Sequence, residues 1–382
     1  MLIPLSKPSF SKLEEKTILK VIKSGWLTHG KYNEKFEKYF KSYIGSKYCL
    51  SLNSCTSALV LAIKCQNIIG EVIVPSFTWL SSANAIILAG ATPVFCDSDL
   101  KTRNVKKEHI EPLITNKTEA IMIVHYGGQS CEMDEIINLC NKYKLKLIED
   151  SAETIGGTWK KKYAGSWGIG CFSFFPTKNI TTGEGGIITC SNKKLYELFK
   201  SNAAHGIKTQ SYEREKYKIL PWERIAVTAG YNFRMSNILA AIGFEQIQKI
   251  DYLNKKRIKN ANKYNQIINA KKLPVETPYK HPLAKHVYQT YSIQVESHIR
   301  DKLVLYLKKN NIGASVHFTP PLHLQHFFKK RYPQRTKLSN AELLSKSIIS
   351  LPMYPDLSYA EIEYVCKYLD KFFKSNYKLE NK

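Results

Sequence analysis

Lys178 is the residue whose surroundings most favour chemistry. It lies between an aromatic run at 171–175 and a glycine-rich turn at 183–186 that leads into another apolar run. A lysine amine held between packed strands is partly desolvated, and the neutral amine is a nucleophile toward carbonyl carbon. The chain contains many lysines, so Lys178 would by default be an ordinary surface residue. Only its neighbours in the sequence favour a chemical role.

Three other features lie near the ends of apolar runs. Asp150 ends a strongly apolar run, where burying a carboxylate is costly unless it is paired. The simpler alternative is that Asp150 caps the helical stretch that follows. Residues 53–57, Asn-Ser-Cys-Thr-Ser, would surround an anion at a helix start or form an ordinary cap. Trp79 would stack on a planar ligand or pack in the core. With Lys178, these groups form the set that a pyridoxal phosphate site needs.

Short apolar runs alternate with helical patterns, which predicts an α/β fold with a mainly parallel sheet. Strands are expected at 72–74, 93–96, 121–124, 145–148, 171–175 and 186–190. Helices are expected at 11–24, 36–43, 57–66, 81–89, 133–143 and 238–250. Ligands of such sheets bind at the carboxyl ends of the strands, where most of the polar features lie.

The character of the sequence changes near residue 250. A helical stretch at 255–272 is rich in lysine and asparagine, and shorter mixed elements follow it, ending in a helix at 359–373. We therefore expect a large domain at 1–250, and the family resemblance given below implies that this domain binds the cofactor and that its N-terminal segment lines the substrate pocket. A smaller α+β domain is expected at 251–382.

From about Trp26 to Gly243 the sequence resembles the pyridoxal phosphate-dependent nucleotide-sugar aminotransferases of the DegT/DnrJ/EryC1/StrS group. The motifs that carry the resemblance are Gly-Trp-Leu-Thr at 25–28, Ser-Cys-Thr-Ser-Ala-Leu at 54–59, Val-Ile-Val-Pro-Ser-Phe-Thr at 72–78, Gly-Ala-Thr-Pro-Val-Phe at 90–95, Val-His-Tyr-Gly at 124–127, Glu-Asp-Ser-Ala-Glu at 149–153, the stretch 173–178 with Gly-Glu-Gly-Gly at 183–186, and Gly-Tyr-Asn-Phe-Arg-Met at 230–235. The resemblance implies a fold-type-I transferase whose large α/β/α domain holds a mainly parallel seven-stranded sheet. The last third matches loosely.

The resemblance also implies roles for individual residues. Lys178 would bind the cofactor as a Schiff base and then carry a proton between C4′ and the substrate carbon. Asp150 would pair with the pyridine N–H, and Trp79 would stack on the ring. The backbone N–H groups of Cys55 and Thr56 would hold the phosphate, together with the Thr56 hydroxyl and Ser173.

Three of these positions carry further implications. Cys55 stands where the family often has glycine, which a backbone phosphate contact tolerates if φ is negative. Glu153 stands where many members have glutamine, near the ring hydroxyl. Asn232 would reach the phosphate of the neighbouring subunit's cofactor, so the resemblance implies a homodimer.

Five residues are candidate substrate contacts. Trp26 and Thr28 would line the sugar-nucleotide pocket, unless they belong to a packed loop. Arg234 would touch the substrate diphosphate across the dimer, or form a structural ion pair. His317 and His323 resemble part of a loop that closes near the substrate, and a structural role is the alternative.

The resemblance implies transfer of an amino group from L-glutamate to a keto carbon of a nucleotide-linked 6-deoxysugar. C4 is expected, as in perosamine synthases, with a product used for amino sugars of lipopolysaccharide O-antigen. The alternatives are a sugar 3-aminotransferase, a dehydratase, a non-catalytic homologue and a polyanion-binding protein. Lys178 speaks against the dehydratases, in which histidine replaces it. The choice among GDP, UDP and dTDP would depend on the last third and on residues 208–224.

Composition and charge limit the classes of partner. The 382 residues carry 57 basic and 32 acidic side chains, a net charge of +25, but only eight of the basic residues are arginine. Arginine is the residue suited to bidentate phosphate and base contacts, so nucleic acid is disfavoured as a partner. The nine cysteines include no Cys-x-x-Cys pair, which argues against a metal site or a disulfide framework. Neither a signal peptide nor a membrane span is expected, and the protein is expected to be cytoplasmic.

Overall fold

The computed structural model describes residues 1–208 and 224–380, with side chains up to residue 375. Most of the 208–224 segment expected to influence substrate choice therefore lies outside the described residues. The centre of the molecule is a seven-stranded sheet in the order β1-β9-β8-β5-β4-β2-β3. Its strands are β1 (Tyr48–Leu52), β2 (Glu71–Pro75), β3 (Thr92–Cys96), β4 (Thr118–Val124), β5 (Lys146–Asp150), β8 (Ile169–Ser173) and β9 (Gly186–Cys190).

The expectation of a mainly parallel sheet is confirmed. Strands β3, β2, β4, β5 and β8 pair in parallel, and only β9 and β1 run antiparallel to their neighbours. Six strands coincide with the apolar runs of the sequence. The seventh, β1, was missed because its sequence, Tyr-Cys-Leu-Ser-Leu, interrupts the apolar side chains with a serine.

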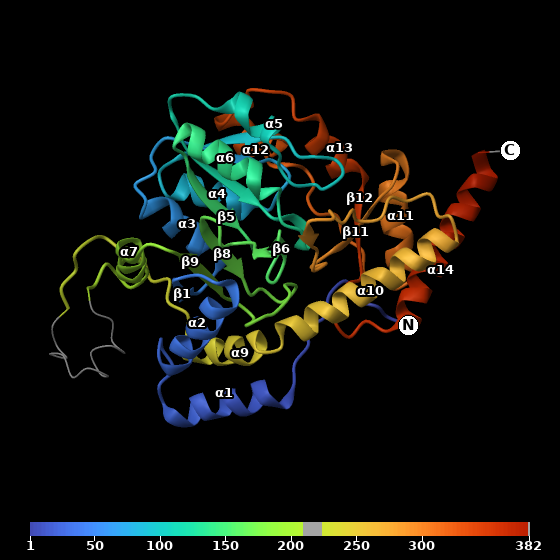
Figure 1. Ribbon diagram of the computed structural model, residues 1–382. Helices are drawn as coiled ribbons and strands as arrows, with labels where there is room; N and C mark the ends of the chain where they lie inside the picture. The colour runs from blue at the N-terminus through green and yellow to red at the C-terminus, as the bar shows by residue number, and fades with distance from the viewer. Residues whose placement is uncertain (209–223, 381–382) are drawn as a thin grey trace.

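Helices cover both faces of the sheet (Figure 1). Alternate residues of one strand enter different cores: Val72 and Val74 pack with α3 (Cys55–Lys64) and α4 (Leu80–Leu88), whereas Ile73 packs with α6 (Met133–Tyr143). This alternation follows from the two-residue period of a strand. Burial on both faces explains why the strands read as continuous apolar runs.

Three further helices pack beside the β1 end of the sheet. They are α1 (Lys12–Ser24), α2 (Lys31–Ile44) and α9 (Asn237–Ile247). Helix α1 begins at a capping box formed by Ser11 and Glu14, and it ends at Gly25, whose φ of 71° places it in the left-handed region that glycine favours. Figure 1 shows α9 between α1 and the body of the sheet.

Helix α10 (Ile250–Ala270) connects two parts of the molecule (Figure 1). Its first residues, Ile250 and Leu253, belong to the core beside α2 and α9. Its later residues, Tyr264 and Ile268, pack with the hairpin of β11 (Tyr291–Gln294) and β12 (Ile348–Leu351), and with α11 (Ser297–Lys309) and α14 (Tyr359–Glu380). The single helix expected at 238–250 is wrong in its end, because α9 stops at Ile247 and α10 begins at Ile250.

Some residues of the last third pack against the large sheet and not within the C-terminal core. Leu322, Phe328 and Leu344 belong to the core over the large sheet, although they follow residue 250. Ile3 forms a parallel bridge with Ile312 and packs in the C-terminal core. The domain division at residue 250 stays a prediction, and the packing shows that each part lends segments to the other.

The remaining elements are short or peripheral. They are α5 (Lys107–Ile110), η1 (Glu111–Leu113), η2 (Tyr126–Gly128), β6 (Thr158–Trp159), β7 (Lys162–Tyr163), α7 (Lys193–Ala203), β10 (Ala284–Lys285), η3 (Leu322–Leu324), α12 (His326–Arg331) and α13 (Ser339–Ser347). Within the described part of the chain, no helix has both the length and the hydropathy needed to cross a bilayer.

Candidate active site

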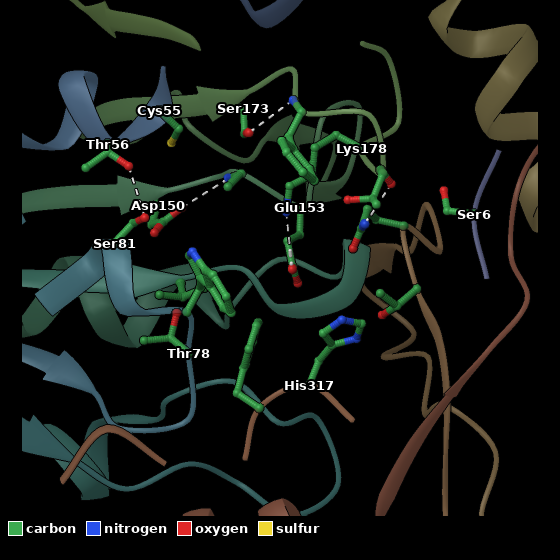
Figure 2. Close-up of a pocket in the computed structure, with 18 of the residues that line it drawn as sticks. Ser6, Cys55, Thr56, Thr78, Ser81, Asp150, Glu153, Ser173, Lys178 and His317 are labelled. Atoms are coloured by element: carbon green, nitrogen blue, oxygen red, sulfur yellow. Dashed lines mark hydrogen bonds and ion pairs between the residues drawn. The ribbon is translucent and has the colours of Figure 1, made fainter. Parts of the chain in front are cut away.

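A cavity of about 420 Å³ opens at the carboxyl ends of β5 and β8, beside the start of α3 (Figure 2). Segments from the last third complete its wall, among them residues 289–290, 317–318 and 350–353. The cavity brings together eight of the residues expected from sequence, which are Cys55, Thr56, Trp79, Asp150, Glu153, Ser173, Lys178 and His317.

Asp150 is a buried carboxylate that forms no ion pair with a described residue, although the charge of the Lys178 amine helps to lower its pKa. Its side chain accepts hydrogen bonds from the Ser82 hydroxyl (2.8 Å) and from the Ala152 backbone N–H (3.2 Å). Burial raises the pKa of Asp150, and these hydrogen bonds partly oppose the rise. Among the described residues it forms no ion pair, so the carboxylate can still receive a positively charged N–H group from a ligand.

Lys178 lies in the loop between β8 and β9 and faces Glu153 (Figure 2). The distance from its Nζ to Glu153 Oε1 is 3.4 Å, and both side chains are largely buried. The other carboxylate oxygen of Glu153 accepts a hydrogen bond from the Gly127 N–H at 2.9 Å, which fixes the carboxylate. The amine therefore sits at the cavity wall, where a ligand carbonyl can reach it.

The start of α3 provides an anion cradle. Ser54 caps this ten-residue helix by accepting a hydrogen bond from the Ser57 N–H. The backbone N–H groups of Cys55 and Thr56 donate to no described residue, as expected in the first turn of a helix. Cys55 is not among the residues with positive φ, so its side chain in place of hydrogen causes no backbone strain.

Close packing holds this cradle against the sheet. A Cβ atom on Gly186 would lie 2.3 Å from the Ser54 carbonyl carbon and 2.5 Å from the Cys55 nitrogen. The Thr56 hydroxyl donates to Ser81 Oγ at 3.0 Å. Ser173 ends β8, and its hydroxyl accepts a weak hydrogen bond from the Phe175 N–H at 3.4 Å. Free N–H groups at a helix start, with hydroxyls beside them, are donors of the kind that a phosphate group accepts.

Trp79 and His317 also line the cavity. Trp79, which precedes α4, is 59% exposed, and its ring lies 6.1 Å from that of Phe318. The Nδ1 of His317 lies 2.9 Å from the Ser350 hydroxyl, and burial lowers the pKa of the imidazole. The exposure of the indole rules out the core role for Trp79, and stacking on a planar ligand stays a prediction.

His323 does not reach the cavity, which corrects its expected role as a substrate contact. Its ring is buried between the Ser76 hydroxyl, 2.6 Å from Nδ1, and Glu342, 3.4 Å from Nε2. These contacts connect η3 to the loop after β2 and to α13. Sequence proximity to His317 suggested a shared role, but six residues along the chain carry His323 into the core.

The four remaining candidates lie outside the cavity of the single chain. Trp26 donates its indole N–H to the His29 carbonyl, and Thr28 is exposed. Asn232 is also exposed, and Arg234 forms a bridge with Leu52. Their roles toward the substrate or a second subunit stay predictions.

Sequence reasoning missed the residues that hold the lysine loop from behind. Arg257 of α10 is 1% exposed, and its guanidinium donates to the carbonyls of Lys178 (3.3 Å), Gln289 (3.2 Å) and Met353 (3.0 Å). The Gln289 amide in turn donates to the Thr177 carbonyl at 2.9 Å. No local pattern signals Arg257, because it lies 79 residues from Lys178 in a lysine-rich helix.

The site corresponds to a known family. A model described as the DegT/DnrJ/EryC1/StrS aminotransferase family matches residues 8–370. The chain belongs to this family. Aminotransferases of this family use pyridoxal phosphate, and the acid, amine and anion cradle of the cavity fit that cofactor.

Individual members of the family are similar over nearly the whole chain. The uncharacterized protein MJ1066 of Methanocaldococcus jannaschii is 38% identical, with 98% of both chains covered. The spore coat polysaccharide biosynthesis protein SpsC of Bacillus subtilis is 34% identical, with 94% of both covered. Helicobacter pylori PseC, an aminotransferase involved in the biosynthesis of pseudoaminic acid, is 28% identical with a TM-score of 0.90, covering 98% of this chain and all of its own. The PLP-form of Streptococcus pneumoniae Spr1654 is 26% identical with a TM-score of 0.89, covering 97% and 98%.

Proposed function

We propose that the protein transfers an amino group from L-glutamate to C4 of a nucleotide-linked 4-keto-6-deoxysugar. The observation that carries the proposal is one cavity in which the Lys178 amine, the buried Asp150 carboxylate and the start of α3 meet. A sugar substrate is supported by the printed functions of two relatives, PseC in pseudoaminic acid biosynthesis and SpsC in spore coat polysaccharide biosynthesis. We place the product in the synthesis of surface glycans for the same reason.

Pyridoxal phosphate, when bound, would supply an electron sink for negative charge on the substrate carbon. Asp150 would keep a proton on the pyridine nitrogen, which its buried and uncompensated charge favours. The N–H groups of Cys55 and Thr56, the Thr56 hydroxyl and Ser173 would hold the phosphate. Trp79 would cover one face of the ring and exclude water from it.

Lys178 would bind the cofactor through its amine and then act as the base and acid at the reacting carbon. Glu153, 3.4 Å from this amine, would first hold it in place and then lie beside the cofactor ring. Over a full cycle the amino group leaves glutamate, which becomes 2-oxoglutarate. The sugar carbonyl becomes an amine-bearing carbon, so the two substrates exchange an amino group for an oxygen atom.

The central experiment joins a half-reaction to a product assay. The purified holoenzyme is mixed with L-glutamate, and the cofactor absorbance and 2-oxoglutarate are measured. A panel of 3-keto and 4-keto sugars linked to GDP, UDP or dTDP is then added, and products are identified by mass and NMR. We expect one equivalent of 2-oxoglutarate per site and amination at C4. Amination at C3 would favour the 3-aminotransferase, loss of water without amine incorporation would favour the dehydratase, and no cofactor conversion would favour a non-catalytic protein.

A variant of Lys178 tests whether this residue is required for turnover. Lys178→Ala should lose turnover with every sugar and amino donor, since no other described lysine lines the cavity. Lys194→Ala, at an exposed position of α7, is the matched control and should retain wild-type turnover. Full activity of Lys178→Ala would overturn the mechanism.

We also propose that the active unit is a homodimer in which Asn232 completes the neighbouring site. Asn232 is exposed and lies outside the cavity of its own chain, which supports a role toward a second copy. Mixing inactive Lys178→Ala with Asn232→Ala tests this in one step. If each chain lends Asn232 to its neighbour, mixed dimers contain one intact site and recover activity. If Asn232 serves its own chain, the mixture gains nothing over the two variants.

A cytoplasmic setting is part of the same proposal. All nine cysteines are free thiols, and eight of them are buried. Burial raises the pKa of the Cys55 thiol beside the phosphate cradle and keeps the thiol protonated, which suits a reducing compartment.

A further inference from the structure

A second cavity of about 420 Å³ lies away from the active site, between residues 100–103, which follow β3, and residues 262–265 of α10. Residues 276–280, which precede β10, form its other wall. The residues that line it are Leu100, Lys101, Arg103, Asn262, Asn265, Glu276, Thr277, Pro278, Tyr279, Lys280 and Tyr288. None of these residues lines the cavity that contains Lys178.

Arg103 is a buried cation to which the described residues offer no hydrogen-bond acceptor. Its side chain is 6% exposed, and the Nε atom is buried without a hydrogen-bond partner. Across the described residues, its guanidinium donates to no oxygen and forms no ion pair. Burial lowers the pKa of Arg103, which shows how poorly its charge is solvated. The nearby Tyr126 and Glu276 partly oppose this fall in pKa, but no hydrogen bond or ion pair joins them to Arg103 in the described part of the chain. A buried guanidinium without a hydrogen-bonded acceptor is costly, and no described residue provides one.

The surroundings of Arg103 add positive charge. Lys101 and Lys280 line the same cavity, and Glu276 is the one carboxylate among its lining residues. The Lys101 amine lies over the Tyr279 ring, 4.2 Å from its centre, and is held near the entrance. This excess of cations also acts on buried His286, whose pKa falls to about 3 through burial first and then through Arg103 and Lys280.

We propose that this cavity binds a small oxyanion, a carboxylate or a phosphate group, through Arg103, with Lys101 and Lys280 at its rim. The planar guanidinium presents parallel N–H groups that match two oxygens of such a group. An oxyanion would give the Nε–H the acceptor it lacks and would neutralise the buried charge. The small cavity size excludes nucleic acid, which needs an extended surface.

The site is separate from the aminotransferase chemistry. The Tyr126–Gly127 turn stands between the two cavities: the Gly127 N–H donates to Glu153 on the active-site side, at 2.9 Å. On the other side, Gly127 lines a space of about 10 Å³ together with Arg103 and His286. The proposed anion therefore occupies its own pocket while the cofactor fills the first one.

Calorimetric titration of the holoenzyme tests the proposal, because bound cofactor occupies the phosphate cradle of the active site. Inorganic phosphate and citrate serve as probes for the two kinds of oxyanion, and the stronger of them identifies the group. We expect Arg103→Gln to weaken binding at least about tenfold, the loss of one bidentate charged contact. Lys101→Gln and Lys280→Gln should weaken it less. Lys346→Gln, at an exposed position of α13, is the matched control and should bind as the wild type does.

Thermal unfolding provides a second signature that a structural arginine would not give. Without anion, Arg103→Gln removes an uncompensated buried charge, so its melting temperature should equal or exceed that of the wild type. With anion, the wild type should gain stability and the variant should not. Wild-type affinity of Arg103→Gln for both probes, or a lower melting temperature of the variant without anion, would overturn the proposal.

Discussion

Replacement of Arg257 by methionine tests how the fold holds the catalytic lysine. Arg257 donates three hydrogen bonds to carbonyls, one of them on Lys178 itself. Methionine has a similar length and no donors, so the variant leaves three buried carbonyls without this partner. The lysine loop then loses the hydrogen bond that joins Lys178 itself to α10, while the Asn179–Asn254 and Thr177–Gln289 hydrogen bonds remain.

The magnitude follows from the contacts. Three hydrogen bonds from a charged donor contribute about 4.5 kcal/mol at the lower figure of about 1.5 kcal/mol each. Against this, the Nε of Arg257 is buried without a partner, and removing it recovers about 1–3 kcal/mol. The free energy of unfolding should therefore fall by about 1.5–3.5 kcal/mol. A shift of the lysine loop by a fraction of an ångström should slow the glutamate half-reaction at least about tenfold.

Urea unfolding and single-turnover absorbance measure the two effects. Asn260→Ala is the matched control: Asn260 lies one turn further along α10 and donates to the Tyr354 carbonyl at 3.0 Å, away from Lys178. It should cost about 1 kcal/mol and leave the half-reaction rate unchanged. A wild-type rate in Arg257→Met, or an equal rate loss in both variants, would refute the view that Arg257 positions the lysine loop.

Three further outcomes follow from the structure. Burial lowers the pKa of His286 to about 3 in the fold, against 6.5 in the unfolded chain, so its contribution to the free energy of unfolding is complete above pH 6.5 and declines as pH falls toward 3. Urea unfolding at pH 5 should therefore show a free energy of unfolding about 2 kcal/mol lower than at neutral pH, and His286→Gln should not show this loss. Gly186→Ala should displace the start of α3, because the added Cβ meets Ser54, and fluorescence titration of the apoenzyme should show at least about tenfold weaker cofactor binding; unchanged affinity would contradict the close packing. Ser82→Ala removes a hydrogen bond that lowers the pKa of Asp150, so this pKa should rise further, and the acid limb of the pH–rate profile should move to higher pH; an unmoved limb would show that Asp150 does not control it.

The sheet and the cofactor-facing residues were accessible from sequence for physical reasons. Strands buried on both faces are mostly apolar, so six of seven contain apolar runs that sequence reveals, whereas β1 breaks this pattern at Ser51. A carboxylate at the end of such a strand demands a partner, which singled out Asp150. The neighbouring residues of Lys178 and of the 53–57 segment identified the other two candidate groups. These signals are local, and each is set by a few neighbouring residues.

The positions of two histidines in the last third could not be predicted from their neighbours in the sequence. His317 and His323 lie six residues apart and looked alike in sequence, yet one lines the cavity and the other is buried beside Ser76. Their fates depend on how the 311–324 segment crosses from the C-terminal hairpin to the large sheet. That path is decided by contacts with β12 and with the loop after β2, and no spacing within the segment encodes it.

By itself the sequence determined a mainly parallel α/β core, a family, and several residues that gather in one cavity, Lys178, Asp150 and the start of α3 among them. Only the tertiary structure decided what supports them: Arg257 behind Lys178, Ser82 against Asp150, and Ser350 beside His317. It alone also revealed Arg103 in a cavity without an acceptor. The reason is that burial creates the need for a partner, while the choice of partner depends on segments that meet only when the chain has folded.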